Sequence, residues 1–461
     1  MLSQGIFDGL KKHQKSRDIR REILEELALH PKSIVVLDDD PTGTQTVHNV
    51  PVVTQWSETI LEQMLKTQPL FFILTNSRSL QRKEANALNL LLGKRLNRIS
   101  KELGKNMIVI SRGDSTLRGH YPNEVDALRT GLGWHSAQEV LAPAFFAGNR
   151  YTYKDIHYVR EGVHFTPVGD TPFAEDNTFG YSSSNLRDWI TEKTNGNIKR
   201  DKVTSISIDS IRYGKPVTVA QTLRQPWSHL IVNALELQDL QMVALACLKS
   251  KRPFMYRTAA SFVNAISGVE PKKIETETLP ASKNRNVGGL TIVGSYVPKT
   301  TAQLNYLKAK DSYLDFLELE VSWLECEHSF LEQIKKLAFN VANVMRNGRD
   351  AVVYTSRKVK SGTSKEESLE IVNKVSNGLV QIVKQLQVQP RYIIAKGGIT
   401  SSDIAVKGLN VKQAMVAGQV LDGVPLWLIQ GEVKFPNLPY VVFPGNVGDK
   451  TALYQLIQKL R

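Results

Sequence analysis

Short apolar runs rich in β-branched residues recur along the chain, and stretches with helical periodicity separate them. Such runs predict buried strands, and their alternation with helices predicts an α/β architecture with largely parallel sheets. The first part of the chain carries predicted strands at 33–38, 51–55, 69–75, 106–111, 139–143, 203–208 and 229–234. A second series follows at 289–293, 315–321, 351–356, 391–395 and 438–443.

A polar stretch separates the two series of strands. Residues 270–286 contain two prolines and have no clear period, which is typical of an interdomain linker. A chain of 461 residues is also too long for one ordinary core. We therefore predict two domains, residues 1–280 and 281–461, each built on a largely parallel sheet flanked by helices, with the active site in the cleft between them.

Two segments of the first domain differ from this pattern. Residues 5–30 combine lysines and arginines with apolar residues at helical spacing, which predicts a basic amphipathic helix. Residues 145–190 are rich in glycine, aromatic residues and serine, which favours a long ordered loop region. Long loops in compact domains are often binding elements or lids.

Composition narrows the class of protein and its partners. Hydrophobic residues make up 41% and charged residues 23% of the chain. No apolar run approaches the roughly 20 residues of a membrane span, and the amino terminus lacks the apolar region of a signal peptide, so we expect a cytoplasmic protein. The net charge of +14 is spread along the chain without a nucleic-acid-binding motif. It favours small anionic ligands, with no nucleic acid and no membrane as partner.

Polar loops follow several predicted strands of the first domain. Four loops share this design, at 37–43, 74–79, 110–119 and 141–145. Because parallel strands place their carboxyl ends on one edge of a sheet, these loops are expected to converge on one crevice. Its predicted polar residues are Asp39, Asp40, Asp114, Arg78, Arg112, Arg118, Ser77, Ser115 and Thr116. Asp38 is expected to point away from the crevice, since neighbouring side chains of a strand alternate faces.

The residue types of this crevice suggest a ligand. The arginine fork grips carboxylates, while aspartates suit sugar hydroxyls or a magnesium ion, so a small polyhydroxy acid is predicted. Two plainer interpretations remain open. Asp114 and Arg118 could form an exposed helical ion pair, and Asp40 to Gly43 could be a simple tight turn.

Glycine loops follow strands of the second domain. Gly397 and Gly398 precede a helix that is expected to begin near Ser402, and Gly445 to Gly448 follow the last strand. Such junctions let backbone amides approach a phosphate, and Ser295 follows a third strand where it could donate to a phosphate oxygen. Acids and arginines in one domain with glycine loops in the other fit phosphoryl transfer to a hydroxyl.

The motifs, taken in order, resemble those of the four-carbon acid sugar kinases. They are Asp39-Asp40-Pro41-Thr42-Gly43, Asn76-Ser77-Arg78, Asp114-Ser115-Thr116-Leu117-Arg118-Gly119, Gly397-Gly398-Ile399-Thr400-Ser401 and Gly445-Asn446-Val447-Gly448. That family phosphorylates acids such as threonate, erythronate and 3-oxo-tetronates with ATP. Its amino-terminal domain binds the sugar acid and its carboxy-terminal domain binds the nucleotide.

The resemblance implies roles for matching residues. Substrate contacts are implied for Asp40, Arg78, Arg112, Gly113, Asp114, Ser115, Thr116 and Arg118. ATP contacts are implied for Ser295, Gly397, Gly398, Ile399, Thr400, Gly445, Asn446 and Gly448. The catalytic aspartate is one of Asp39, Asp40 and Asp114, which the sequence does not rank.

These observations favour an ATP-dependent kinase for a small sugar acid, with Mg²⁺ bridging the nucleotide phosphates. No metal-ligating residue is assigned, and self-association into a homo-oligomer is left open. Two alternatives remain: a lyase or dehydrogenase acting on the same acids, and a non-catalytic regulatory protein that binds sugar acid and nucleotide.

Overall fold

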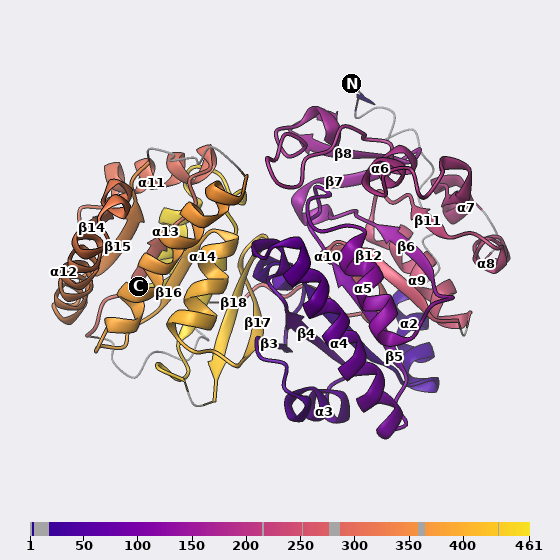
Figure 1. Ribbon diagram of the computed structural model, residues 1–461, viewed down its shortest axis with the longest axis horizontal. Helices are drawn as coiled ribbons and strands as arrows, with labels where there is room; N and C mark the ends of the chain where they lie inside the picture. Colours follow the sequence, from indigo (N-terminus) through magenta and orange to yellow (C-terminus); the bar gives the residue numbers. More distant parts are fainter. Residues whose placement is uncertain are drawn as a thin grey trace. The chain divides into compact units, whose positions relative to one another are not determined.

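The computed structural model describes residues 2–3, 18–213, 216–250, 252–275, 286–357, 365–431 and 433–461. It divides the chain into two compact units (Figure 1). Unit 1 contains Met1–Thr46 and Gln55–Glu270, and unit 2 contains Val47–Thr54 and Pro271–Arg461. The predicted boundary at residue 280 lies outside the described residues. Residues 47–54, which a single boundary leaves in the first domain, belong to unit 2.

Unit 1 is built on a parallel sheet of seven strands. Their order is β10 (Val203–Ile206), β11 (His229–Val232), β6 (Gln138–Ala142), β12 (Phe254–Thr258), β5 (Met107–Arg112), β2 (Ser33–Asp38) and β4 (Leu70–Leu74). All six residues of β2 and all five of β4 are buried. Their continuous apolar runs fit strands that are covered on both faces.

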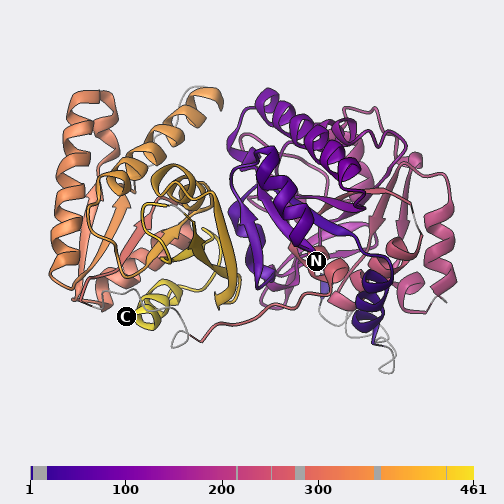
Figure 2. The same ribbon diagram turned by 90° about the horizontal axis from the view of Figure 1, so that it is seen from below.

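Helices cover both faces of this sheet (Figures 1 and 2). On one face α4 (Arg82–Glu102) packs against α5 (Asn123–Leu132) and α3 (Glu58–Thr67). On the other, α9 (Leu237–Lys249) packs against α2 (Ile19–Leu29), α10 (Ala260–Ser267), α7 (Ile208–Arg212) and α8 (Pro216–Arg224). Of the predicted helix at 5–30, residues 5–17 lie outside the described residues, and residues 19–29 are helical.

The prediction of a long loop at 145–190 is wrong. The segment forms an antiparallel sheet of β7 (Arg150–Tyr153), β8 (Ile156–Glu161) and β9 (His164–Pro167), to which β1 (Leu2–Ser3) adds. Helix α6 (Leu186–Lys193) follows. These strands are only four to six residues long and carry charged and aromatic side chains rather than apolar runs, so no strand pattern is visible there in the sequence.

Unit 2 combines parallel and antiparallel strands. The parallel part has the order β14 (Leu314–Leu319), β15 (Asp350–Thr355), β13 (Leu290–Val293), β16 (Ile393–Lys396) and β19 (Pro439–Phe443). β18 (Val424–Gln430), β17 (Gln413–Leu421) and β3 (Val50–Val53) continue it in antiparallel pairing. The β17–β18 hairpin is absent from the predicted strands.

The helices of unit 2 also form two layers. On one face α13 (Lys365–Gln385) packs against α12 (Glu327–Arg346) and α14 (Gly398–Asp403), and on the other α11 (Pro298–Lys310) packs against α15 (Ala452–Leu460) (Figures 1 and 2). The core between the α11–α15 layer and the sheet contains Leu304, Leu307, Leu453 and Leu456, all fully buried. Among the described helices of both units, none is long and apolar enough to cross a membrane.

Candidate active site

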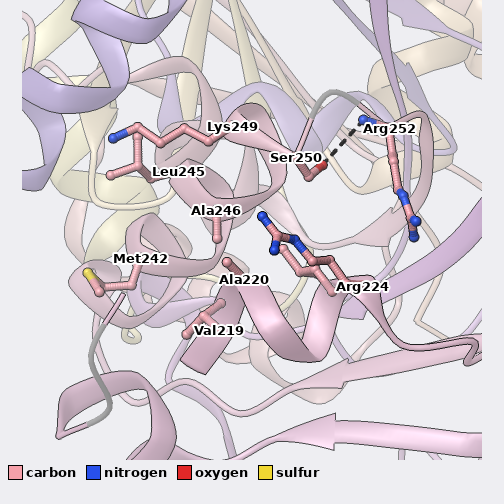
Figure 3. Close-up of a pocket in the computed structure, with 10 residues that line it drawn as sticks. Val219, Ala220, Arg224, Met242, Leu245, Ala246, Lys249, Ser250 and Arg252 are labelled. Atoms are coloured by element: carbon pink, nitrogen blue, oxygen red, sulfur yellow. Dashed lines mark hydrogen bonds between the residues drawn. The ribbon is translucent and has the colours of Figure 1, made fainter. Parts of the chain in front are cut away.

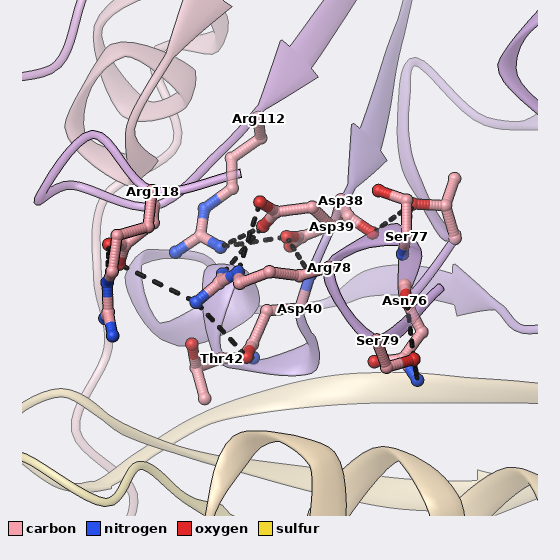
Figure 4. A network of polar contacts seen from close by, with 12 residues as sticks. Asp38, Asp39, Asp40, Thr42, Asn76, Ser77, Arg78, Ser79, Arg112 and Arg118 are labelled. Carbon is pink, nitrogen blue, oxygen red and sulfur yellow. Dashed lines mark hydrogen bonds and ion pairs between the residues drawn. The ribbon is translucent and has the colours of Figure 1, made fainter. Parts of the chain in front are cut away.

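Three neighbouring strands of unit 1 end in polar loops that the sequence singled out. β2, β4 and β5 are adjacent and parallel, so the residues that follow them meet at one edge of the sheet. Figure 4 shows the side chains of these loops pointing toward one another. The fourth predicted loop, 141–145, follows β6, and β12 lies between β6 and β5. Leu141 and Pro143 of this loop line a small pocket together with Asp114 and Leu117 of the loop after β5, so all four loops meet at this edge of the sheet.

Arg78 connects three of the predicted acids. Its Nη2 donates to Oδ1 of Asp39 at 2.8 Å and its Nε donates to Oδ2 at 3.3 Å. Its Nη1 lies 3.7 Å from Oδ2 of Asp40 and 3.8 Å from Oδ1 of Asp114. Burial lowers the pKa of Arg78, but these carboxylates outweigh burial and raise the pKa well above its ordinary value.

Asp38 and Arg112 form the buried floor of this network. Arg112 Nη1 lies 3.0 Å from Oδ1 of Asp38 and 3.5 Å from Oδ1 of Asp39. The expectation that Asp38 points away from the crevice is wrong, because its carboxylate shares this guanidinium with Asp39 (Figure 4). Burial raises the pKa of the Asp38 carboxyl to about 7, against the lowering effect of Arg112.

The loop after β5 holds Asp114 between two arginines. Arg118 Nε donates to Oδ2 of Asp114 at 2.8 Å, and the Thr116 hydroxyl donates to the same oxygen. Residues 113–118 are not helical, and the two charged side chains are 13% and 21% exposed, so the exposed helical ion pair is ruled out. Burial raises the pKa of Asp114, but the arginines and Thr116 outweigh it and hold the pKa far below its usual value.

The plain-turn interpretation of Asp40 is correct for the backbone. Pro41–Thr46 form a 3₁₀ helix, and Oδ1 of Asp40 accepts a hydrogen bond from the Thr42 amide at 2.8 Å. Among the described residues, Oδ2 of Asp40 has the 3.7 Å contact with Arg78 as its one polar contact. One carboxylate oxygen therefore supports the turn while the other remains on the site.

A second buried network beside this one was missed by the sequence reasoning. Arg257, on β12, donates to Glu124 and, at 3.1 Å, to the Ser111 hydroxyl, and Ser77 donates to Glu124 at 2.9 Å. Arg257 also explains why residue 113 is a glycine, because a Cβ there would lie 2.3 Å from the Arg257 guanidinium. The sequence signal for β12 was the apolar run Phe254–Tyr256. This run is too short, and polar residues follow it too closely, for it to be recognised as a strand.

Exposure divides the network into an inner and an outer layer. The side chains of Asp38, Asp39 and Arg112 are at most 4% exposed, so they support the site from beneath. The outer side chains are 12–21% exposed and belong to Asp40, Asp114, Arg78 and Arg118. Of the charged residues predicted at this edge, these four are placed to touch a ligand.

The glycine loops of unit 2 converge around Ser295. They follow β13, β16 and β19, which are adjacent and parallel. Gly397 has φ of +122°, and a Cβ there would lie 3.1 Å from the Ser295 Cβ. A Cβ on Gly445 would lie 2.8 Å from the Ser295 hydroxyl. The two loops therefore approach Ser295 more closely than side chains would allow.

The remaining predicted nucleotide residues surround these positions. Gly398, Ile399 and Thr400 form the first turn of α14, which begins at Gly398 and not near Ser402 as expected. Asn446 is exposed, and Gly448 has φ of +80° in a loop whose Val447 carbonyl accepts from Gln303.

Three side chains of the glycine loops were not predicted. The Thr300 hydroxyl lies 3.1 Å from that of Ser295 and 3.0 Å from the Gly445 carbonyl. Arg357 Nη1 donates to the Ser295 carbonyl at 2.7 Å. The buried Lys396, the last residue of β16, donates to the Pro444 carbonyl at 2.7 Å. This hydrogen bond ties the end of β16 to the loop that follows β19. None of the three lies in a glycine motif, so spacing alone could not find them.

The donor sets of the two units fit different ligands. Within the described residues, no three Asp, Glu, His or Cys side chains are grouped to hold a metal ion. Gly397 and Gly445 have no side chain beside Ser295, and the backbone amides of glycine loops are groups that can bind a phosphate. Mg²⁺ usually binds proteins through one or two carboxylates together with substrate phosphates, so the lack of a protein cage is compatible with magnesium arriving on ATP.

A separate cavity of about 410 Å³ lies between α8 and α9 (Figure 3). Its described lining is mainly apolar, with Arg224, Lys249 and Arg252 at the rim and Ser250 as its hydroxyl group. Its lining among the described residues includes no carboxylate or imidazole for acid–base chemistry. The acid–arginine network at the ends of β2, β4 and β5 is therefore the candidate active site.

Comparison with known proteins agrees with this division. The chain matches a family model described as a sugar-binding N-terminal domain over residues 34–266 and one described as a nucleotide-binding C-terminal domain over residues 290–453. No curated protein matches the chain.

Solved structures share the fold. A candidate tRNA synthase of Salmonella typhimurium LT2 is similar with a TM-score of 0.65 and 14% identity, covering 93% of this chain and 98% of that one. A Haemophilus influenzae protein of the DUF1537 family is similar with a TM-score of 0.60 and 18% identity, covering 92% and 99%. The two domain matches account for both units and agree with the ordered motifs of the sequence, and the chain therefore belongs to the four-carbon acid sugar kinase family.

Proposed function

We propose that this protein is an ATP-dependent kinase that transfers the γ-phosphoryl group of ATP to a hydroxyl of a small, four-carbon sugar acid. One observation carries the proposal: an accessible edge of carboxylates and guanidinium groups lies in the sugar-binding domain of a chain whose other domain binds nucleotide. Phosphoryl transfer needs an oriented acceptor hydroxyl and compensation of phosphate charge, and these groups supply both.

Asp40 is the best candidate for the residue that orients and deprotonates the acceptor hydroxyl. Asp39 accepts two hydrogen bonds from Arg78, and Asp114 accepts from Arg118 and Thr116 with a pKa held far below its usual value. Both carboxylates are therefore already engaged by hydrogen-bond donors of the protein. Asp40 keeps one carboxylate oxygen without a hydrogen bond from the described residues. The reaction needs only a modest base at this position, because positioning and electrostatics dominate the catalysis of phosphoryl transfer.

The other groups fit supporting roles. Arg78, fixed by Asp39 and next to Asp40, is placed to stabilise the charge of the transferred group. The backbone around Gly397 and Gly445 and the Ser295 hydroxyl would hold the ATP phosphates. Bound Mg²⁺ would neutralise those phosphates. The proposal requires both sets of loops to bind the same pair of reactants during transfer.

The decisive experiment is a coupled ADP-release screen over four- to six-carbon sugar acids, with the phosphorylated position read by NMR. The expected result is ADP release that depends on one acid or a few related acids. Consumption of a sugar acid without ADP release would favour a lyase or dehydrogenase. Calorimetric binding of both ligands without product would favour a regulatory protein.

Two variants assign the functions of the units. Asp40→Asn is expected to lower turnover by about 10-fold or more while ATP affinity stays within about 2-fold, since it removes only the base. Gly445→Ala is expected to weaken ATP binding, because its Cβ meets the Ser295 hydroxyl. Gly408→Ala is the matched control in unit 2, since a Cβ there would lie no closer than 3.4 Å to its neighbours. Full turnover by Asp40→Asn would contradict the assignment of Asp40.

A further inference from the structure

Arg150, at the start of β7, has no carboxylate partner among the described residues. Its Nη1 donates to the carbonyl of Gly148, and its buried Nε has no hydrogen-bond partner. Burial lowers the pKa of this guanidinium, and the nearby Asp114 only partly offsets the effect. In contrast, nearby carboxylates raise the pKa of Arg78 and Arg118. A partly buried cation without a counter-charge is unfavourable, so this arrangement indicates a missing anion.

Phe173 links Arg150 to the candidate active site. The guanidinium carbon of Arg118 lies 5.1 Å from the centroid of the Phe173 ring, and that of Arg150 lies 5.5 Å from the same centroid. Contact with an aromatic ring holds both cations in place without neutralising them. Arg118 also has Asp176 at 3.6 Å, whereas among the described residues Arg150 contacts the ring and a backbone carbonyl but no carboxylate.

The contacts form a continuous series with opposite charges at its ends. Asp40 contacts Arg78, Arg78 contacts Asp114, and Asp114 contacts Arg118 (Figure 4). Arg118 and Arg150 then share Phe173. The carboxylate with the fewest partners is at one end, and the guanidinium without a carboxylate is at the other. This edge of unit 1 is therefore electrically polarised.

A sugar acid has the complementary polarity. We propose that Arg118 and Arg150, on Phe173, form a subsite for the carboxylate of the substrate, which directs an acceptor hydroxyl toward Asp40. This inference rests on the proposed kinase function and adds the orientation of the substrate and a specificity residue, Arg150. A carboxylate gains charge-assisted hydrogen bonds there that a neutral polyol cannot make. Selectivity for acids over the corresponding sugar alcohols follows.

The test compares Arg150→Gln, Arg150→Lys and the matched control Arg160→Gln. Arg160, on the neighbouring strand β8, also stacks on an aromatic ring, Phe165, and donates to a backbone carbonyl, that of Gly162. The probes are the best four-carbon acid from the screen and the four-carbon sugar alcohol of the same configuration. Each protein is checked for folding by circular dichroism, and acid binding is measured by calorimetry as well as by steady-state kinetics.

The expected result is a 10- to 100-fold loss of acid affinity in Arg150→Gln, the size of one charge-assisted interaction, with KM for ATP unchanged. Weak binding of the sugar alcohol should not change, Arg150→Lys should recover part of the loss, and Arg160→Gln should resemble wild type. Unchanged acid affinity in a folded Arg150→Gln variant would overturn the subsite. If the wild type binds the acid without ADP release, the kinase proposal fails, while weaker binding by Arg150→Gln still supports the subsite.

Discussion

At the residue scale, the three consecutive aspartates of the first loop have three different environments. Asp38 is fully buried against Arg112, Asp39 accepts both hydrogen bonds from Arg78, and Asp40 keeps an oxygen on the outer surface. The sequence shows three equal carboxylates, because the differences come from partners on other strands. The sequence predicts only that these strands are parallel and that their loops lie close together. It does not predict which arginine pairs with which aspartate.

The stability of the protein should depend on pH through Asp38. Its pKa is about 7 in the folded state, against an ordinary value of 3.8, so between about pH 4 and pH 7 the unfolded chain has lost a proton that the folded protein keeps. Stability from this group is therefore full below about pH 4 and is lost as the pH rises through 7. The shift of about 3 units corresponds to roughly 4 kcal/mol as an upper limit.

Denaturant unfolding from pH 4 to pH 8 checks this expectation. The difference in unfolding free energy between wild type and Asp38→Asn should fall by up to about 4 kcal/mol across pH 4–7 and then level off. Taking the difference between the two proteins removes the pH dependence that their other titrating groups share. If this difference stays constant from pH 4 to pH 8, Asp38 is ionised in the folded protein throughout that range.

At the element scale, the segment that was predicted as a loop supports the substrate edge. From β8, His157 Nε2 donates to the Ser115 carbonyl at 2.8 Å, and its Nδ1 lies 3.0 Å from the Thr152 hydroxyl. Burial lowers the pKa of His157 to about 4, so the imidazole is neutral near pH 7. The Tyr181 hydroxyl donates to the Thr116 carbonyl at 2.6 Å. Two buried side chains thus fix the backbone beside Asp114.

Removing one of these hydrogen bonds should disturb the sugar acid and not ATP. Tyr181→Phe leaves a buried carbonyl without its donor, which costs about 1–3 kcal/mol of stability. It should also raise KM for the sugar acid by about 3- to 10-fold, because the Asp114 loop loses its support. Thermal unfolding and steady-state kinetics measure both effects.

Tyr158→Phe is the matched control, since Tyr158, on β8, is also a buried tyrosine, and its hydroxyl makes no hydrogen bond to the described residues. Equal effects of the two substitutions would mean that the Tyr181 hydroxyl has no special part in positioning the loop.

The elements that the sequence missed share a physical cause. Continuous apolar runs marked β2, β4 and β5 because both faces of these strands are buried. The strands β7 to β9 form a small antiparallel sheet with mixed side chains, and β12 reads as three apolar residues followed by Arg257 and Thr258. These short strands are defined by pairing with distant segments, which a local pattern does not record.

At the scale of the whole molecule, the division into units does not follow one cut in the sequence. Residues 47–54 leave unit 1 and supply β3, which pairs with β17 from Val53 opposite Gln413 to Val50 opposite Val416. The Thr54 amide donates to the Lys412 carbonyl at 3.0 Å, and all four residues of β3 are buried. A linear boundary cannot reveal this exchange, because the strand is an ordinary apolar run among those of the first domain.

The carboxy-terminal unit should therefore be incomplete when it is produced alone. A fragment of residues 271–461 lacks β3. The three valines of β3 contribute roughly 1.5–3 kcal/mol each to stability when they are buried. The loss also exposes the backbone edge of β17, which favours aggregation. We expect the fragment to unfold at a lower temperature and to aggregate more than the same fragment mixed with a synthetic peptide of residues 46–55. A scrambled peptide of equal composition is the control, and ATP binding by calorimetry is the functional readout. If the fragment alone unfolds at the same temperature with and without the peptide, β3 is dispensable and the unit ends at a single boundary after all.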